Sequence, residues 1–393
     1  MSESVDKYAD IRPYNDDEVA ASVARLINDN AFVDVIAKYN LPRFLSYFPF
    51  ITRPLVRHQL NKNWGNTQSV DQVQQEVANY LNKLIARTTS EVTYSGIDKL
   101  DPQQAYLFIS NHRDIVLDPA LVNWVLFQHN MPTVRIAIGD NLLQIPYITE
   151  LMRLNKSFIV KRSAKAPKEM LKALSHLSAY IYDSLSSGHS IWIAQKEGRA
   201  KDGFDQTDPA LLKMLQLQGR KQKKEFADYA RELKIVPVSI SYQFEPCAVA
   251  KAKELYHKQQ HGQYVKSEGE DIASIVEGFS AAKGHVHLAF GQPIESGCDS
   301  PEQLAKTIDQ QIIDSFFLHP GNYIAGGCTD AVIDQKDAEQ FQQRLATVPA
   351  ELQSLVLAMY AKPFQRKAEM AMDDAEYKAE MAMDDTEKAI SAK

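Results

Sequence analysis

The sequence predicts an α/β fold with a central, mainly parallel or mixed sheet flanked by helices, with N-terminal helices and a small helical C-terminal element. Between residues 85 and 295, short runs rich in β-branched and aromatic residues alternate with longer helix-like segments. The chain has 393 residues, 45% of them apolar and 24% charged, with 16 Gly and 17 Pro. This composition suits a large buried core and excludes a collagenous or disordered chain.

Residues 1–84 are expected to form an N-terminal helical segment, because apolar residues recur at spacings of three and four in AASVARLI and VQQEVANYLNKLIA. Between these stretches, residues 41–56 hold four Phe or Tyr residues, three prolines and two arginines. Proline interrupts them too often for one regular helix. The segment is either an aromatic plug on the core or a membrane-surface patch in which Arg43 and Arg53 meet lipid phosphates.

Residues 85–295 are expected to form one sheet flanked by helices, such as those over 167–185 and 209–217. The expected strands cover 90–96, 105–110, 133–139, 157–162, 190–195, 235–242 and 285–294.

Residues 296–365 are expected to form a C-terminal helical element with a packed helix over 302–317. Residues 366–393 contain an eleven-residue repeat, KAEMAMDDAEY followed by KAEMAMDDTEK. Because this period is close to three helical turns, we expect a solvated tail that is disordered or weakly helical. A docking peptide for a partner is the alternative.

Charge and cysteine usage exclude several classes of protein. The net charge of −6 is too mild to argue for a nucleic-acid partner. Cys247, Cys298 and Cys328 form no Cys-x-x-Cys pair, so neither a disulfide framework nor a cysteine zinc site is indicated. The acidic N-terminus has no secretory signal and no apolar stretch reaches about 18 residues, so we expect a cytoplasmic protein whose membrane contact is peripheral.

Residues 109–119, ISNHRDIVLDP, follow an expected strand and lead into a helix. An imidazole such as that of His112 can take a proton from a hydroxyl, while a carboxylate from Asp118 or Asp114 stabilises the imidazolium. Asp118 before Pro119 is also typical of a helix cap.

Two other chemistries fit less well. His-Arg-Asp occurs in protein kinases, but Pro119 stands where their Asn is expected, and the chain has neither G-x-G-x-x-G nor DFG. The pairs His257/His261 and His285/His287 lack an evident third ligand, so no metal site is expected.

Two further polar clusters also end expected strands. Residues 153–172 contain seven Lys or Arg residues against Glu169, with Lys161 and Arg162 directly at a strand end. Residues 195–203 combine carboxylates, glycine and cations. Solvated surface is the simple explanation for each, but three such clusters at strand ends indicate an anion-binding crevice.

The order of these clusters resembles the glycerol-phosphate and lysophosphatidate acyltransferases, over about residues 85–295. The family's Asn-His-x4-Asp corresponds to Asn111, His112 and Asp118, with one extra residue before the Asp. Its later motifs correspond to Phe158, Ile159 and Lys161 with Arg162 beside it, then Glu197, Gly198 and Arg199, then Pro237 in VPVSI. Asn155 stands where the family has Gly, Lys161 where it has Arg, and Arg199 comes one place early.

One added helical residue would turn a side chain by about 100°. Pro119 disfavours the α conformation at Asp118, so we expect a loop after His112 that absorbs the extra residue. Asp114 is the fallback partner for His112.

The resemblance implies acyl transfer from an acyl thioester to a hydroxyl of glycerol 3-phosphate or lysophosphatidate, with His112 as general base. It assigns phosphate binding to Lys161, Arg162, Glu197, Gly198 and Arg199, and pocket shaping to Phe158, Ile159 and Pro237. It implies no cofactor, with acyl-CoA or acyl carrier protein as co-substrate, and peripheral binding at the inner face of a membrane. The alternative is a lipid-binding or scaffold protein that keeps the fold without turnover.

Overall fold

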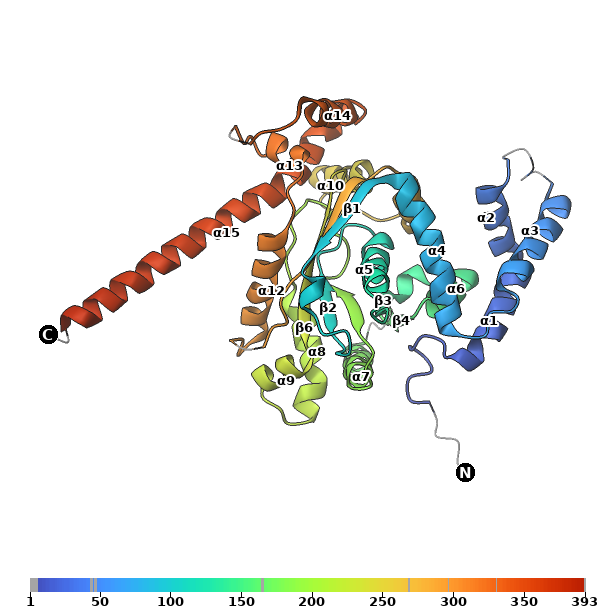
Figure 1. Ribbon diagram of the computed structural model, residues 1–393, viewed down its shortest axis with the longest axis horizontal. Helices are drawn as coiled ribbons and strands as arrows, with labels where there is room; N and C mark the ends of the chain where they lie inside the picture. Colours follow the sequence, from blue (N-terminus) through green and yellow to red (C-terminus); the bar gives the residue numbers. More distant parts are fainter. Residues whose placement is uncertain are drawn as a thin grey trace.

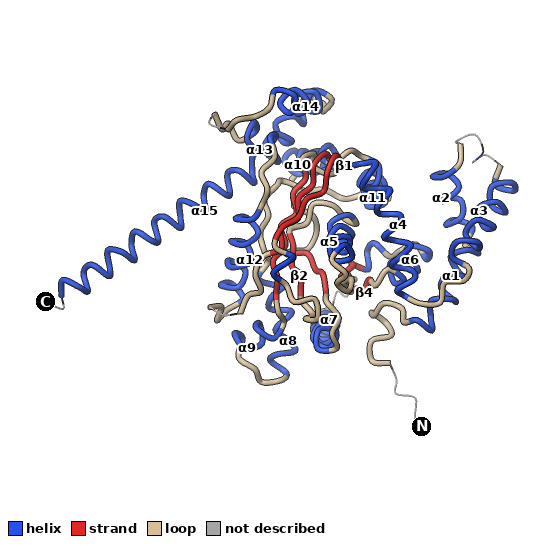
Figure 2. The backbone as a smooth tube through the Cα atoms, viewed as in Figure 1, coloured by secondary structure: helices blue, strands red, loops and turns tan. Residues whose placement is uncertain are grey.

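The structure is a computed structural model that describes residues 6–42, 45, 48–163, 166–267, 269–295, 297–329 and 331–391. For residues 39, 40 and 373–391 it describes the backbone alone. Arg43, one of the two arginines expected at a membrane, lies outside these ranges. A central sheet carries helices on both faces, with the N-terminal helices at one end of the molecule and a long C-terminal helix at the other (Figures 1 and 2).

The sheet contains a strand at each of the expected positions. The strands are β1 (Thr89–Ser95), β2 (Leu107–Ser110), β3 (Arg135–Gly139), β4 (Ser157–Val160), β5 (Ile191–Ala194), β6 (Ile235–Tyr242) and β7 (Gly284–Phe290). Their order is β1-β7-β6-β2-β5-β3-β4. Strands β6, β2, β5, β3 and β4 run parallel, whereas β7 is antiparallel to β6 and parallel to β1. The predicted α/β fold is confirmed, and the sheet is mixed.

Successive side chains of a strand point to opposite faces of the sheet and pack into two separate cores, one on each face. Leu107 and Ile109 of β2 face α7 (Pro167–Ser186), α8 (Pro209–Lys221), α9 (Phe226–Glu232) and α12 (Pro301–Ser315). Phe108 faces α4 (Val70–Thr88) and α5 (Leu117–Gln128) on the other side. Between strands lie α6 (Pro146–Leu154), α10 (Ala248–His261), α11 (Glu270–Ser280) and two 3₁₀ turns, Ile97–Lys99 and Asp140–Leu142.

The N-terminal segment forms α1 (Asp16–Asn28), α2 (Asn30–Asn40) and α3 (Pro49–Trp64), which share a small apolar core with residues of α4 and α6. The expectation that residues 41–56 do not form one regular helix is confirmed, because α3 begins only at Pro49. Pro49 occupies its first turn, where a missing N–H costs nothing, so Pro54 alone interrupts the helix interior.

The expectation that residues 41–56 form an aromatic plug on the core is wrong for Phe48 and Phe50, the aromatic residues of this segment that the structure describes. Phe48 and Phe50 are 45% and 72% exposed and meet edge to face, beside the exposed side chains of Ile51 and Leu55. Among the described residues, no helix has the length and apolar character needed to cross a bilayer.

The C-terminal part contains α13 (Pro320–Ala325), α14 (Gln335–Ala346) and α15 (Ala350–Ser391). Helix α15 leaves the body of the molecule as a single projecting rod (Figure 1). The eleven-residue repeat, expected to be disordered or weakly helical, has a helical backbone within α15.

Candidate active site

The polar clusters lie at one edge of the sheet, because the parallel strands β6, β2, β5, β3 and β4 all end there. Asn111 follows β2 and binds both backbone groups of Ile240, its Nδ2 donating to the carbonyl at 2.9 Å and its Oδ1 accepting from the N–H at 2.8 Å. The loop after β5 joins the same edge, since the N–H of Ala200 donates to the His112 carbonyl at 2.9 Å.

His112 and Asp118 form a hydrogen-bonded pair at this edge. His112 Nδ1 lies 2.8 Å from Asp118 Oδ2, and the edge of its ring contacts Trp192. The His112 side chain is 13% exposed, whereas that of Asp118 is fully buried. Because a carboxylate accepts the Nδ1 proton, Nε2 carries the free lone pair. A non-catalytic scaffold would not require this arrangement.

The Asp118 carboxylate accepts hydrogen bonds at both of its oxygens. Its Oδ2 also accepts from the N–H groups of Arg113 at 2.6 Å and Asp114 at 2.9 Å, and its Oδ1 accepts from the Tyr242 hydroxyl at 2.7 Å. Burial alone would raise the pKa of Asp118, but the hydrogen bonds from His112 and Tyr242 outweigh it and hold the pKa below its usual value. Asp118 is therefore ionised.

Asp114, and not Asp118, binds the backbone N–H groups at the start of α5, whose N-cap residue is Val116. Its Oδ1 accepts from the N–H groups of Val116 at 3.0 Å and Leu117 at 2.9 Å, at the start of α5. Its Oδ2 is buried and has no hydrogen-bond partner among the described residues. Burial and the charge of Asp118 raise the pKa of Asp114. The surroundings thus shift the pKa values of the two carboxylates in opposite directions.

The expected loop does absorb the extra residue, but it is shorter than predicted. It covers residues 112–116, and Asp118 is already the second residue of α5. Pro119 is tolerated there because it lies in the first helical turn, where backbone N–H groups have no intrahelical partner.

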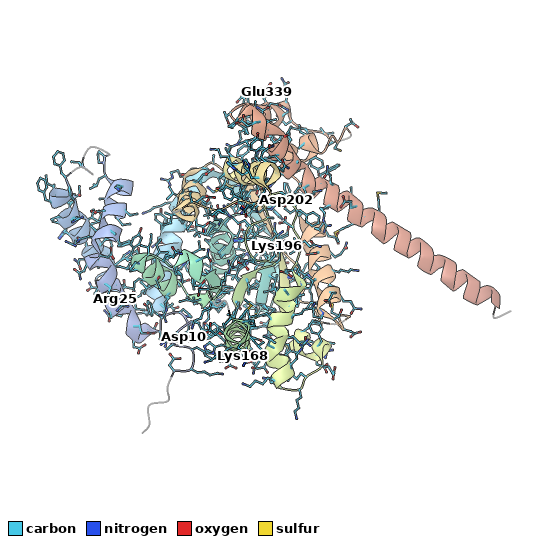
Figure 3. The ribbon with its side chains drawn as sticks, turned by 180° about the vertical axis from the view of Figure 1, so that it is seen from behind. Asp10, Arg25, Lys168, Lys196, Asp202 and Glu339 are labelled. Atoms are coloured by element: carbon cyan, nitrogen blue, oxygen red, sulfur yellow. The ribbon has the colours of Figure 1, made fainter. Side chains whose placement is uncertain are left out.

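The expected phosphate ligands lie in two places. Arg162 Nη1 is 3.3 Å from Glu197 Oε1, so these two residues come together from the ends of β4 and β5. Lys161 points elsewhere and binds Asp10 of the N-terminal segment at 2.5 Å. Asp10 lies toward the N-terminal end of the molecule, below Arg25, whereas Lys196, within residues 195–203, lies nearer the centre (Figure 3).

Gly198 and Arg199 complete the third cluster. Gly198 has a φ of +78° and open space where a Cβ would stand, which lets a ligand approach the backbone closely. Arg199 is half-buried, and its Nη1 has no hydrogen-bond partner among the described residues. Gly198 is therefore open to an anion, whereas Arg199 Nη1 is buried and unpaired beside it.

The residues expected to shape the pocket contact other parts of the sheet and core. Phe158 is fully buried and packs on Tyr180, with ring centroids 5.0 Å apart. Ile159 is half-buried and its N–H donates to the Ile11 carbonyl. Pro237 is buried in β6 beside Ile109 of β2. None of these contacts involves His112.

Sequence reasoning missed a buried charge network behind the His112 loop. The guanidinium of Arg113 binds Asp205 at 2.5 Å and Glu245 at 3.3 Å. Lys251 donates to Glu245 at 2.6 Å and to the Arg113 carbonyl at 2.7 Å. Arg113 stands in the quoted motif next to His112, which was the one available signal; its partners come from distant parts of the chain.

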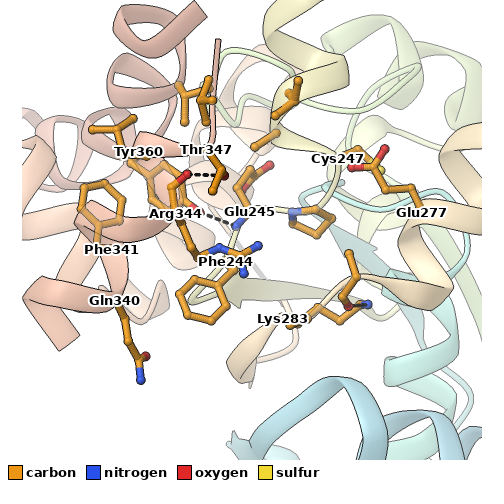
Figure 4. A pocket seen from close by; sticks show the side chains of 18 of the residues that line it. Phe244, Glu245, Cys247, Glu277, Lys283, Gln340, Phe341, Arg344, Thr347 and Tyr360 are labelled. Carbon is orange, nitrogen blue, oxygen red and sulfur yellow. Dashed lines mark hydrogen bonds between the residues drawn. The ribbon is translucent and has the colours of Figure 1, made fainter. Parts of the chain in front are cut away.

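A pocket of about 560 Å³ lies between the α10–α11 region and the C-terminal helices (Figure 4). Glu245 and Gly278 line it and connect it to Arg113 and Asp114, respectively. His112 is not among its lining residues. Among the described residues, no group of three or more His, Cys, Asp or Glu side chains is arranged to hold a metal ion.

Comparison with known proteins identifies the class. Residues 91–243 match the family model described as Acyltransferase. This part of the chain, which runs from β1 to the end of β6 and includes His112 and Asp118, is an acyltransferase domain. The sequence-based recognition of that domain is confirmed.

Other comparisons add little. No curated protein matches the chain. Among solved structures, the chain is similar to the 1-acyl-sn-glycerophosphate (LPA) acyltransferase PlsC from Thermotoga maritima, at 16% identity and a TM-score of 0.38. The overlap covers 74% of this chain and 93% of that chain. A TM-score this low gives the likeness no weight for the fold or the activity.

Proposed function

We propose that this protein transfers a fatty acyl group from an acyl thioester, acyl-CoA or acyl carrier protein, to a hydroxyl of glycerol 3-phosphate or lysophosphatidate. The observation that carries the proposal is the contact of 2.8 Å between His112 Nδ1 and the buried, ionised Asp118, within an acyltransferase domain. The catalytic unit extends over residues 85–295, with residues 1–84, 296–365 and 366–393 as attached elements.

In this mechanism, His112 Nε2 takes the proton of the acceptor hydroxyl as its oxygen attacks the thioester carbonyl carbon. A C–O bond forms and the C–S bond breaks, and the leaving thiolate receives the proton from the imidazolium. Asp118 holds the proton on Nδ1 and stabilises the imidazolium by its negative charge.

The phosphate of the acceptor binds at Arg162, Gly198 and Arg199. A guanidinium recognises phosphate oxygens in bidentate fashion, and the open backbone at Gly198 permits close approach. In the absence of substrate, the Glu197 carboxylate pairs with the Arg162 guanidinium, and the phosphate displaces it from there. Lys161 contributes its charge at longer range, because its amine is bound to Asp10.

The protein binds peripherally at the inner face of a membrane through the start of α3. Phe48, Phe50, Ile51 and Leu55 are exposed there and can enter the interfacial region of a bilayer. Arg53 is paired with Asp34 at 2.8 Å, so it is less available to lipid phosphates than the sequence suggests.

The experiment is acyl transfer by the purified protein from labelled acyl-CoA or acyl carrier protein to glycerol 3-phosphate and to lysophosphatidate. We expect activity with at least one donor and acceptor, and its loss in His112→Ala. A folded protein that is inactive with every pair, or an equally active His112→Ala variant, contradicts the proposal.

A further inference from the structure

The oxygen of Asp118 that faces away from His112 is held by a tyrosine. Tyr242 is the last residue of β6, and its hydroxyl lies 2.7 Å from Asp118 Oδ1. The resemblance to acyltransferases gave this residue no role, and it lies 124 positions from Asp118 in the chain.

Burial and charge fix the direction of this hydrogen bond. The Tyr242 ring is 4% exposed and packs in the core beneath α4 and α5 with Val238 and Ile240. Burial, followed by the charge of Asp118, raises the pKa of Tyr242 well above its usual value. The phenol therefore keeps its proton and donates it to the carboxylate.

We propose that Tyr242 is a positioning residue of the acyl-transfer site, whose hydroxyl orients the Asp118 carboxylate so that Oδ2 meets His112 Nδ1. This inference rests on the proposed function. The two backbone N–H groups that bind Oδ2 leave Oδ1 free to move, and the bond from Tyr242 at the opposite oxygen fixes the plane of the carboxylate. The same bond draws negative charge toward Oδ1 and away from the imidazole.

Other charged groups surround this pair and are unchanged by altering Tyr242. On the loop side lie Asp114 and Arg113, and on the side of β6 and α10 lie Glu245 and Lys251, which bind each other. Lys283, before β7, is buried near Asp114. The positive charges of Arg113 and Lys251 balance the negative charges of Glu245 and Asp205. These charges stay in place in a Tyr242 variant, so its effect reports on the lost hydroxyl.

Tyr242→Phe removes the hydroxyl and leaves the ring in place. Without its donor, the ionised form of Asp118 is less stable, and its negative charge concentrates on Oδ2 beside His112. Both effects should strengthen the attraction between Asp118 and a protonated His112. The acid limb of the pH–rate profile should move upward by about one pH unit, and kcat should fall about tenfold while KM values change little.

Tyr106→Phe is a matched control in the same core. Tyr106 is also 4% exposed, and its hydroxyl accepts from the Asp101 N–H at 2.9 Å, away from the site. A merely structural role for buried tyrosine hydroxyls predicts similar effects for both variants.

The decisive measurement does not need activity. In protein labelled with ¹⁵N-histidine, the His112 ring signals are identified by their loss in His112→Ala and followed during pH titration. The half-titration pH should rise in Tyr242→Phe and stay unchanged in Tyr106→Phe. If Tyr242→Phe does not fold, 3-fluorotyrosine at position 242 makes a stronger donor and should lower the half-titration pH. An unchanged titration, or an equal shift in Tyr106→Phe, overturns the inference, whereas lack of acyl transfer by the unaltered protein overturns the proposed function alone.

Discussion

Replacing Asp118 with Asn separates the charge of this carboxylate from its shape. Its Oδ2 accepts from His112 Nδ1 and from two backbone N–H groups, while Oδ1 accepts from Tyr242. An amide can keep its oxygen at the Oδ2 position, because the Tyr242 hydroxyl can accept from the new NH₂ group. The variant therefore retains the geometry and loses the negative charge beside His112.

The lost charge should appear directly in the rate. A hydrogen bond to a charged group contributes about 1.5–3 kcal/mol, and each 1.36 kcal/mol of barrier is a factor of about ten. We therefore expect kcat/KM of Asp118→Asn to fall about 10- to 150-fold in the acyl-transfer assay, with native circular dichroism.

Asp114→Asn is the matched control, four residues away and also buried. An amide oxygen can still accept from the N–H groups of Val116 and Leu117. Burial already favours the neutral side chain by raising the pKa of Asp114, so kcat/KM should stay within about threefold of the unaltered protein. Equal losses in both variants, or a greater loss in Asp114→Asn, would refute this reasoning.

The pH dependence of stability distinguishes the same two carboxylates. Hydrogen bonds that overcome burial lower the pKa of Asp118, so its stabilisation is present above the unfolded value of about 3.9 and is lost as pH falls through the folded value. Burial raises the pKa of Asp114, so its ionisation destabilises the fold at higher pH. Asp114→Asn should resist urea better than the unaltered protein at pH 7, and this advantage should vanish near pH 4. A constant difference over this range contradicts the assignment.

Three further variants test other parts of the molecule. Gly278→Ala places a Cβ 2.4 Å from Asp114 Oδ2 and should reduce the free energy of unfolding in urea by about 1–3 kcal/mol; an unchanged midpoint would show that α11 moves freely. Replacing Phe48 and Phe50 with Ser should weaken sedimentation with anionic vesicles about tenfold, and equal binding by a folded variant would remove the membrane role of α3. Arg162→Ala should raise the KM for the phosphate-bearing acceptor about tenfold and leave that for the thioester unchanged; the opposite pattern would place the phosphate elsewhere.

Local patterns in the sequence were sufficient to predict the strands and His112. Each strand is a short run that contains β-branched or aromatic residues, and the Asn-His pair directly follows one of them. The choice between Asp114 and Asp118 was not local. It depends on where α5 begins, and the structure places its start before Asp118 despite Pro119.

Long-range contacts explain the remaining differences. Lys161 and Arg162 are adjacent in the chain but have different partners, Asp10 and Glu197. Nothing near Tyr242 in the sequence indicates that its hydroxyl meets Asp118, because the contact requires β6 to lie beside β2. Likewise, the partners of Arg113 come from separate loops.

The two hydrogen bonds between the Asn111 side chain and the backbone of Ile240 replace a pair of main-chain bonds beyond the end of β2. Strand β2 ends at Ser110, yet the amide of Asn111 adds one further rung against β6 while the main chain turns toward His112. The Asn111 side chain thereby fixes the position of the His112 loop relative to β6, which carries Tyr242. The start of α5 is tied to the same point, because this helix carries Asp118, the partner of His112.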